Sequence, residues 1–141
     1  MSEKLRVGVV GYSDKKFDEA IAKALLLIGF KVSGAEDKDA DKVVVISGLT
    51  DLGIPSIAYK IAKERGWKTI GIACKKAEEY DKFPCDEEKI VGEEWGDESE
   101  TFLNSIDVLI RVGGGEQSMK EVKKAKEMKL QVYEYDLPIA K

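Results

Sequence analysis

Short, continuously apolar runs recur along the chain and dominate its pattern. The run LRVGVVG at Leu5–Gly11 is too continuously apolar for a strand with one wet face, so it predicts a buried parallel strand. The run VVVIS at Val43–Ser47 is a second strong run of the same kind. Further strands are expected at residues 30–33, 68–74, 89–91, 107–112 and 130–138.

Helical periodicity fills the intervals between these runs. Apolar side chains recur at helical spacing from Phe17 to Ile28, which predicts an amphipathic helix packed on a sheet. Ser13 or Asp14 is the expected N-cap of this helix, and Gly29 is its expected C-terminal stop.

Later helices are marked by their ends. Pro55 stands near the first position of one helix, where its missing N–H does no harm, and Gly66 stops that helix. A shorter helix is expected near residues 98–104, and the turn GGGEQS at residues 113–118 opens another. The apolar face of that last helix is expected to consist of Met119, Val122, Ala125 and Met128. Residues 75–88 are charged, contain Pro84 and lack strong periodicity, which is typical of a surface loop or a lid.

Repeated alternation of strand and helix determines the predicted fold class. It implies right-handed crossovers, and therefore a doubly wound, mainly parallel α/β sheet with helices on both faces, a Rossmann-like architecture. The 141 residues are expected to form a single domain. In such sheets ligands lie beyond the carboxyl ends of the strands, at the point where the strand order reverses.

Composition and charge narrow the classes of partner. The chain has 43% hydrophobic and 35% charged residues, as an ordinary globular protein does, and its net charge is -4 with the two signs well mixed. No basic stripe is present for a nucleic-acid backbone, so no nucleic-acid partner is expected. No apolar segment has the length of a signal peptide or of a membrane span, which predicts a cytoplasmic protein without membrane contact.

The absence of histidine excludes several kinds of chemistry. Catalysis by Ser-His or Cys-His pairs and by a histidine base is excluded. The only thiols, Cys74 and Cys85, cannot complete a zinc site from Cys and His alone, and both are expected to be reduced. The sequence therefore predicts no metal and no resident cofactor.

The strongest candidate site is the turn from Gly113 to Ser118. Three consecutive glycines let the backbone approach an anion closely, and the helix that follows points free N–H groups at it. A turn that only joined a strand to a helix would need one glycine. The G-x-G-x-x-G and Gly-Lys-Ser/Thr spacings are absent, which excludes dinucleotide and P-loop sites. The expected ligand is a mononucleotide or a sugar phosphate, gripped by Gly113, Gly114, Gly115, Glu116, Gln117 and Ser118.

Other strand exits supply further candidate walls of the pocket. Ligand contacts are expected from the turns that contain Gly11, Tyr12, Ser13, Ser47, Gly48 and Gly53. Trp95 is either a loop anchor or an aromatic face that stacks on a base, and its neighbour Glu94 is a candidate ribose contact. Asp97 and Glu98 follow the same strand and are further candidates.

These motifs resemble a known family. VVISGLTDLGIPSIAYKIAKERG followed by RVGGGEQSMKE is similar to the Rossmann-like superfamily of the Lonely Guy phosphoribohydrolases, also described as lysine decarboxylase-like. Its signature is a glycine run, then Gly-Thr, then Glu three residues after the Thr. The glycine run matches, Ser118 stands at the Thr and Glu121 at the Glu, whereas Gln117 replaces the Gly. The resemblance implies a catalytic role for Glu121, and a homodimer.

The chain also departs from the family. The hydrolases pair that Glu with an Arg from the helix before the glycine strand, and the corresponding stretch here is Glu98-Ser99-Glu100-Thr101. Arg111 is either a substitute or, because it lies inside a buried strand, an anchor for a structural carboxylate. Glu121 itself either faces water in the first turns of its helix or acts on a ribosyl group.

Three hypotheses follow from the sequence. In the first, the protein binds a nucleotide or a nucleotide-derived phosphorylated ligand without cleaving it. In the second, it is a phosphoribohydrolase that cleaves the N-glycosidic bond of a nucleoside monophosphate. In the third, it is an accessory protein in DNA processing, which the acidic charge balance disfavours.

Overall fold

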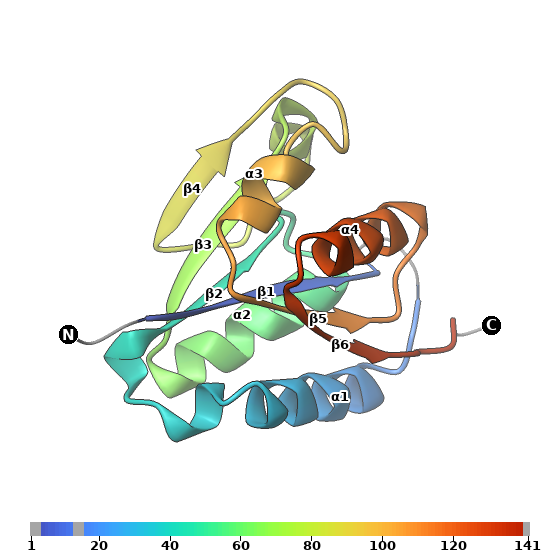
Figure 1. Ribbon diagram of the computed structural model, residues 1–141. Coiled ribbons are helices and arrows are strands. Elements are labelled where there is room, and N and C mark those ends of the chain that lie inside the picture. The colour runs from blue at the N-terminus through green and yellow to red at the C-terminus, as the bar shows by residue number, and fades with distance from the viewer. Residues whose placement is uncertain (1–3, 13–15, 140–141) are drawn as a thin grey trace.

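A parallel sheet forms the centre of the computed structural model, which describes residues 4–12 and 16–139 (Figure 1). Within these residues the sheet has six strands in the order β4-β3-β2-β1-β5-β6, and every neighbouring pair is parallel. The strands are β1 (Leu5–Gly11), β2 (Val43–Ser47), β3 (Lys68–Ala73), β4 (Glu87–Ile90), β5 (Val108–Val112) and β6 (Gln131–Tyr135).

The strand order reverses between β1 and β5. The chain moves outward from β1 through β2 and β3 to β4, then returns to the other side of β1 to form β5 and β6. Gly11 at the end of β1 is in register with Val112 at the end of β5. The switch point of the sheet is therefore bordered by the glycine turn that follows β5.

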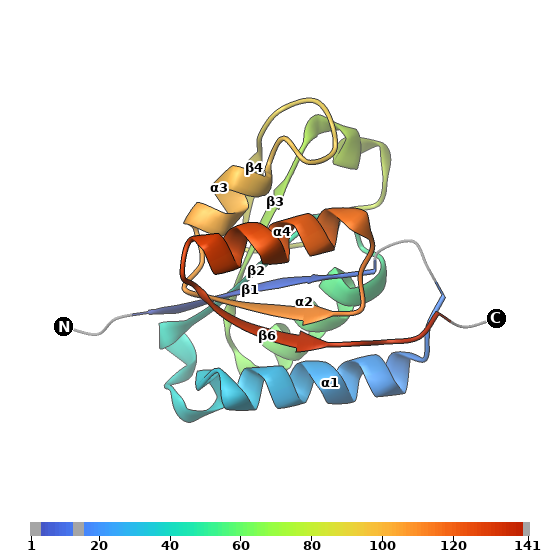
Figure 2. The ribbon, with the colours of Figure 1, turned by 45° about the vertical axis from the view of Figure 1, so that its right-hand side comes forward.

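Helices cover both faces of the sheet, as Figures 1 and 2 show. On one face α1 (Glu19–Val32) and α2 (Gly53–Arg65) pack against an apolar cluster that includes Val7, Val9 and Ile110. On the other face α3 (Ser99–Asn104) and α4 (Glu116–Glu127) pack against a cluster that includes Ile46 and Leu109. Buried strands with apolar residues on both faces confirm the predicted doubly wound α/β fold.

The end of α1 differs from its prediction. Gly29 lies inside the helix, where an added Cβ would approach Ile110 Cγ2 to 2.8 Å. The glycine therefore allows close packing on β5 and does not stop the helix. The helix continues to Val32 and buries Phe30, so the strand expected at residues 30–33 is wrong.

The start of α1 is also displaced from the expected position. Asp18 is the N-cap, and its Oδ1 accepts hydrogen bonds from Ala20 N at 2.9 Å and Ile21 N at 3.1 Å. Ser13 and Asp14, the expected caps, lie outside the described residues.

The ends of α2 and the buried face of α4 test two further predictions. Gly66 follows α2 with φ of 74°, which confirms it as the stop, while Pro55 is the third residue of that helix. In α4 Met119 is 47% exposed, so the expected face is wrong at that position. The buried residues of α4 are Val122 and Ala125, as predicted, together with Ser118 and Glu121.

Residues 75–88 are anchored to the fold. After a 3-10 turn at Lys75–Glu79, Asp51 N donates to Asp81 O at 2.8 Å and Phe83 N donates to Leu49 O at 2.8 Å. The Phe83 ring is buried, 5.1 Å from the ring of Tyr59. The surface segment is thus packed on the loop between β2 and α2 before it enters β4, which begins two residues earlier than expected.

Candidate functional site

A cavity of about 300 Å³ opens at the carboxyl edge of the sheet. Its walls come from the ends of β1, β2 and β3, from the loop before α3 and from the first turns of α4. The candidate residues in its wall are Gly11, Tyr12, Ser47, Gly48, Trp95, Glu98, Gly115, Glu116, Gln117, Ser118 and Glu121. Residues from five separate segments of the sequence therefore meet at one place.

Other candidate residues do not line this cavity. Gly113 and Gly114 form the turn that leads into the wall, and Gly53 is the first residue of α2. Glu94 forms an ion pair with Lys76, with 2.6 Å between Oε2 and Nζ, and its side chain is 68% exposed. Ser13 lies outside the described residues.

The glycine turn has a conformation that other residues rarely adopt. Gly113 and Gly114 have φ of 63° and 110°, and an added Cβ on Gly114 would approach Ser118 Cβ to 2.6 Å. Gly115 is extended and precedes α4, and no side chain of the described residues caps this end of the helix. The N–H groups of the first turn thus remain free of intrahelical partners at the cavity wall.

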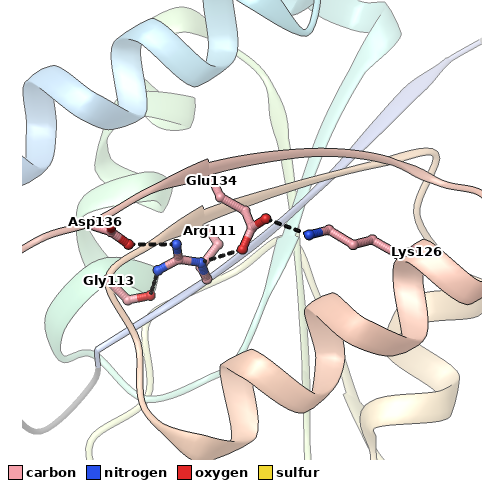
Figure 3. A network of polar contacts seen from close by, with 5 residues as sticks. All are labelled: Arg111, Gly113, Lys126, Glu134 and Asp136. Carbon is pink, nitrogen blue, oxygen red and sulfur yellow. Dashed lines mark hydrogen bonds and ion pairs between the residues drawn. The ribbon is translucent and has the colours of Figure 1, made fainter.

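Arg111, a residue of β5, holds this turn through its side chain (Figure 3). Its Nη1 donates to the carbonyl oxygen of Gly113 at 2.8 Å. Its Nε and Nη2 pair with Glu134 Oε1 at 3.1 Å and with Asp136 Oδ1 at 2.8 Å, and Lys126 Nζ lies 2.8 Å from Glu134 Oε2. Of the two readings of Arg111, the structure shows the structural anchor, because the guanidinium is committed to these partners.

Ser47 and Tyr59 have structural contacts too. Ser47 Oγ donates to the Val9 carbonyl oxygen at 2.6 Å, and Tyr59 Oη donates to the Gly48 carbonyl oxygen at 2.8 Å. Both side chains are buried and hold the exit of β2 against its neighbours.

Glu121 is a buried acid one turn into α4. Its side chain is only 7% exposed, and its Oε2 accepts a hydrogen bond from Ser99 Oγ at 2.9 Å. Burial, and then the nearby negative charge of Glu98, raise the pKa of Glu121 to about 7. The alternative in which this carboxylate faces water is therefore wrong.

Glu98 is the second buried acid of the cavity. It is 6% exposed, and its Oε1 accepts hydrogen bonds from Gln117 Nε2 at 3.0 Å and from Gly96 N at 3.2 Å. Its Oε2 is buried without a hydrogen-bond partner among the described residues. The sequence indicates Glu98 only as one of several acids after a strand, and nothing in its spacing predicts that it reaches Gln117.

The resemblance to the hydrolases implies an arginine beside Glu121. The structure instead brings Glu98 and Ser99 there. None of the described residues that line the cavity is Lys or Arg. The site therefore combines free backbone amides with two buried carboxylates and an exposed aromatic ring, Trp95, at 47% exposure.

Metal-type ligands and thiols are sparse in the described parts of the chain. Residues 4–12 and 16–139 contain no group of three or more His, Cys, Asp or Glu that could hold a metal ion. Cys74 and Cys85 are free, and burial raises the pKa of Cys85 to about 11. Within the same residues, no helix combines the length and the apolar character that crossing a membrane requires.

Comparison with known proteins gives matches in structure only. No protein-family model and no curated protein sequence matches the chain. The molybdenum cofactor binding protein of the phototrophic bacterium Rippkaea orientalis superposes with a TM-score of 0.74 at 23% identity, over 95% of this chain and 77% of that one. The molybdenum cofactor carrier protein of Chlamydomonas reinhardtii gives 0.70 at 24% identity, over 94% and 76%.

A third structure, TM1055, gives a TM-score of 0.70 at 20% identity, over 91% of this chain and 72% of that one. The chain shares the fold of these proteins. The identities are too low for the comparison to establish more than that shared Rossmann-like architecture.

Proposed function

We propose that this protein binds a nucleotide-type phosphorylated ligand in the cavity at the carboxyl edge of the sheet. The phosphate lies against the Gly113–Ser118 turn and the first turn of α4. The observation that carries this proposal is the uncapped N-terminus of α4 at the wall of a cavity of about 300 Å³.

Three features support an anion at this end of the cavity. The twelve residues of α4 give a helix whose aligned peptide dipoles favour negative charge at its start. The glycines leave room for backbone contact, and the location is the switch point of a doubly wound sheet. The volume lies at the lower end of the range for small-molecule sites, as expected for a mononucleotide.

Binding without cleavage is the form of this function that the site favours. The family resemblance implies an arginine beside Glu121, and the described wall of the cavity contains no cationic side chain. Two of the structural neighbours are proteins that bind or carry the molybdenum cofactor. A carrier or sensor role fits a site in which the amides hold the ligand and the described wall residues offer no cation for catalysis.

Phosphoribohydrolase activity is the second candidate, because Glu121 occupies the position of the family's glutamate. A carboxylate there would stabilise positive charge that develops on the ribosyl group as the N-glycosidic bond breaks. Overnight incubation of each bound nucleoside monophosphate, followed by chromatography for free base, separates this candidate from simple binding.

The test of ligand binding is a thermal-shift panel of nucleoside monophosphates, sugar phosphates and the molybdenum cofactor. A ligand that binds only the folded state raises the midpoint of unfolding, by an amount that grows with ligand concentration. We expect at least one phosphorylated compound to raise the midpoint, and Gly114→Val to abolish that rise because its side chain would meet Ser118. A panel without any hit, or hits that Gly114→Val leaves unchanged, would refute the proposed site.

A homodimer is part of the proposal. The outer face of α1 presents Ile21, Ile28 and Val32, each about half exposed, at helical spacing along one side. Apolar residues that line up on an exposed face are typical of a protein contact. We expect light scattering to give twice the chain mass, and Ile28→Lys to lower it to one chain.

A further inference from the structure

The cavity has two chemically different halves. One half consists of the backbone around Gly11 and the first turn of α4 from Gly115 onward, which suits a phosphate. The other half is apolar, with Ile72, Ala73 and Phe102 in its wall and Trp95 on it. Glu98 and Glu121 are the buried acidic side chains of the cavity wall: Glu98 immediately precedes α3, which contributes Phe102, and Glu121 lies beyond the first turn of α4.

Glu98 supplies the unusual feature of the apolar half. Its Oε1 already accepts from Gln117 Nε2 and from Gly96 N. Its Oε2 is buried in the cavity wall and, among the described residues, lacks a donor. A carboxylate can only accept hydrogen bonds, and a buried acceptor left without a donor is costly. The site therefore favours a ligand that brings N–H or O–H donors to this oxygen.

We propose that Glu98, assisted by Glu121, recognises the donor edge of a heterocycle in which a ring N–H stands beside an exocyclic amino group. This is the 2-amino-4-oxopyrimidine edge, which guanine and pterin share. The inference rests on the proposed function, because the phosphate of the same ligand is held at the start of α4.

The chemistry of the edge explains the choice of base. Two adjacent donors suit two neighbouring acceptors, Oε2 of Glu98 and the carboxylate of Glu121, and charge-assisted hydrogen bonds of this kind are strong. Adenine would place a ring acceptor next to its amino donor and set a lone pair against the carboxylate. Hypoxanthine keeps the ring N–H but lacks the amino group, so it retains half of the recognition.

A hydrated divalent cation fits the same oxygens less well. Magnesium keeps several waters and requires a shell of oxygen ligands, whereas the cavity wall that contains Glu98 also includes the apolar Ile72, Ala73 and Phe102. An aromatic ring beside apolar walls is typical of a site for a flat base. The cation is accordingly an alternative outcome of the test.

Calorimetric titration of the full chain with GMP, IMP, AMP and a phosphorylated pterin tests the inference. We expect GMP to bind at least about tenfold more tightly than IMP, and IMP more tightly than AMP. A phosphorylated pterin that binds more tightly than GMP would identify pterin as the source of the edge, and the reverse order would identify guanine. Equal affinities for GMP and AMP would overturn the inference, and this comparison needs no variant.

Variants locate the selectivity on one side chain. Glu98→Gln is expected to weaken the binding of GMP at least about tenfold and to leave the affinity for AMP nearly unchanged. The substitution turns one hydrogen-bond acceptor into a donor. Glu94→Gln, which makes the same change on an exposed side chain four residues away, is the matched control and should alter neither affinity. Selectivity that survives in Glu98→Gln would overturn the inference.

Failure of this inference is distinguishable from failure of the proposed function. If Gly114→Val abolishes binding while GMP and AMP bind equally in the wild type, the phosphate site is correct and the base assignment is wrong. If binding requires Mg²⁺ and Glu98→Gln removes that requirement, the acids bind a cation and the inference is overturned. If none of the four ligands binds, the base assignment is wrong, and the wider thermal-shift panel decides separately whether the phosphate site is wrong as well.

Discussion

Two clusters of charged side chains border the same glycine turn, and they differ in how their charges are balanced. Arg111 lies between Glu134 and Asp136 and holds the Gly113 carbonyl, while Lys126 pairs with Glu134 (Figure 3). On the cavity side, Glu98 and Glu121 are buried acids without a cation among the described wall residues.

The difference separates scaffold from candidate site. In the Arg111 cluster each buried charge has an opposite partner, so the cluster supports the shape of the turn. In the Glu98 and Glu121 pair, burial and like charge raise the pKa of Glu121 to about 7, and one oxygen of Glu98 has no partner in the described chain. Buried acids that lack a cationic partner and line a cavity are typical of ligand-binding sites.

The largest expected effect comes from removing the cation of the balanced cluster. Arg111→Met leaves Glu134 with Lys126 alone and frees the Gly113 carbonyl. We expect a loss of about 3 kcal/mol of unfolding free energy, or about 10 °C in melting temperature. Urea denaturation measures this change. A variant as stable as the wild type would show that the cluster does not support the turn.

Neutralising an acid of the Glu98 and Glu121 pair should instead raise the unfolding free energy. Because the folded pKa of Glu121 lies above its unfolded value, the folded state keeps a proton that the unfolded chain loses. The stability of the wild type should therefore fall as pH rises from about 4.5 to about 7. Glu121→Gln should remove this fall and add about 2 kcal/mol at pH 8, with little change at pH 4. A destabilised variant at pH 8 would contradict this description of the pair.

Glu134 provides the matched contrast. Its hydrogen bond from Lys126, and then that from Arg111, lower its pKa, so its contribution is present above the unfolded pKa and is lost as pH falls. Glu134→Gln should cost about 1 kcal/mol at pH 7 and little below pH 4. The same Glu→Gln change thus raises the unfolding free energy in one cluster and lowers it in the other at pH 8. Denaturation curves of both variants at pH 8 and pH 4 measure this difference.

The smallest effect is expected at the exposed end of the balanced cluster. The Asp136 side chain is 96% exposed although its Oδ1 lies 2.8 Å from Arg111 Nη2. Solvent screens such a pair, so Asp136→Asn should change unfolding free energy by no more than about 0.5 kcal/mol. A larger loss would mean that the outer carboxylate shares in holding the turn.

Local pattern was sufficient for most of the architecture. The apolar runs at β1 and β2 predicted buried parallel strands, and Gly66 predicted the end of α2. The prediction that Gly29 stops α1 was wrong, because a glycine that stops a helix and a glycine that packs a helix on a strand look alike in sequence. Only the distance to Ile110 distinguishes the two roles.

The candidate site was predicted in part. The glycine run after β5 has a local signature, and the structure brings Gly115, Gln117 and Ser118 to a cavity wall. Met119 was expected on the buried face of α4, but the polar Glu121 lies there. A polar residue on a buried face contradicts the hydrophobic pattern, and such positions require knowledge of what lies opposite.

The sequence by itself determined most of the strands, the presence of the helices around them and a glycine turn that needs positive φ, since each depends on residues near in the chain. Only the tertiary structure decided which charges are balanced. Glu98 and Glu121 are 23 positions apart in the chain, as are Arg111 and Glu134. One pair became a buried like-charge pair and the other an ion pair because the sheet and the helices packed on it set their neighbours, and charge interactions depend on distance in space.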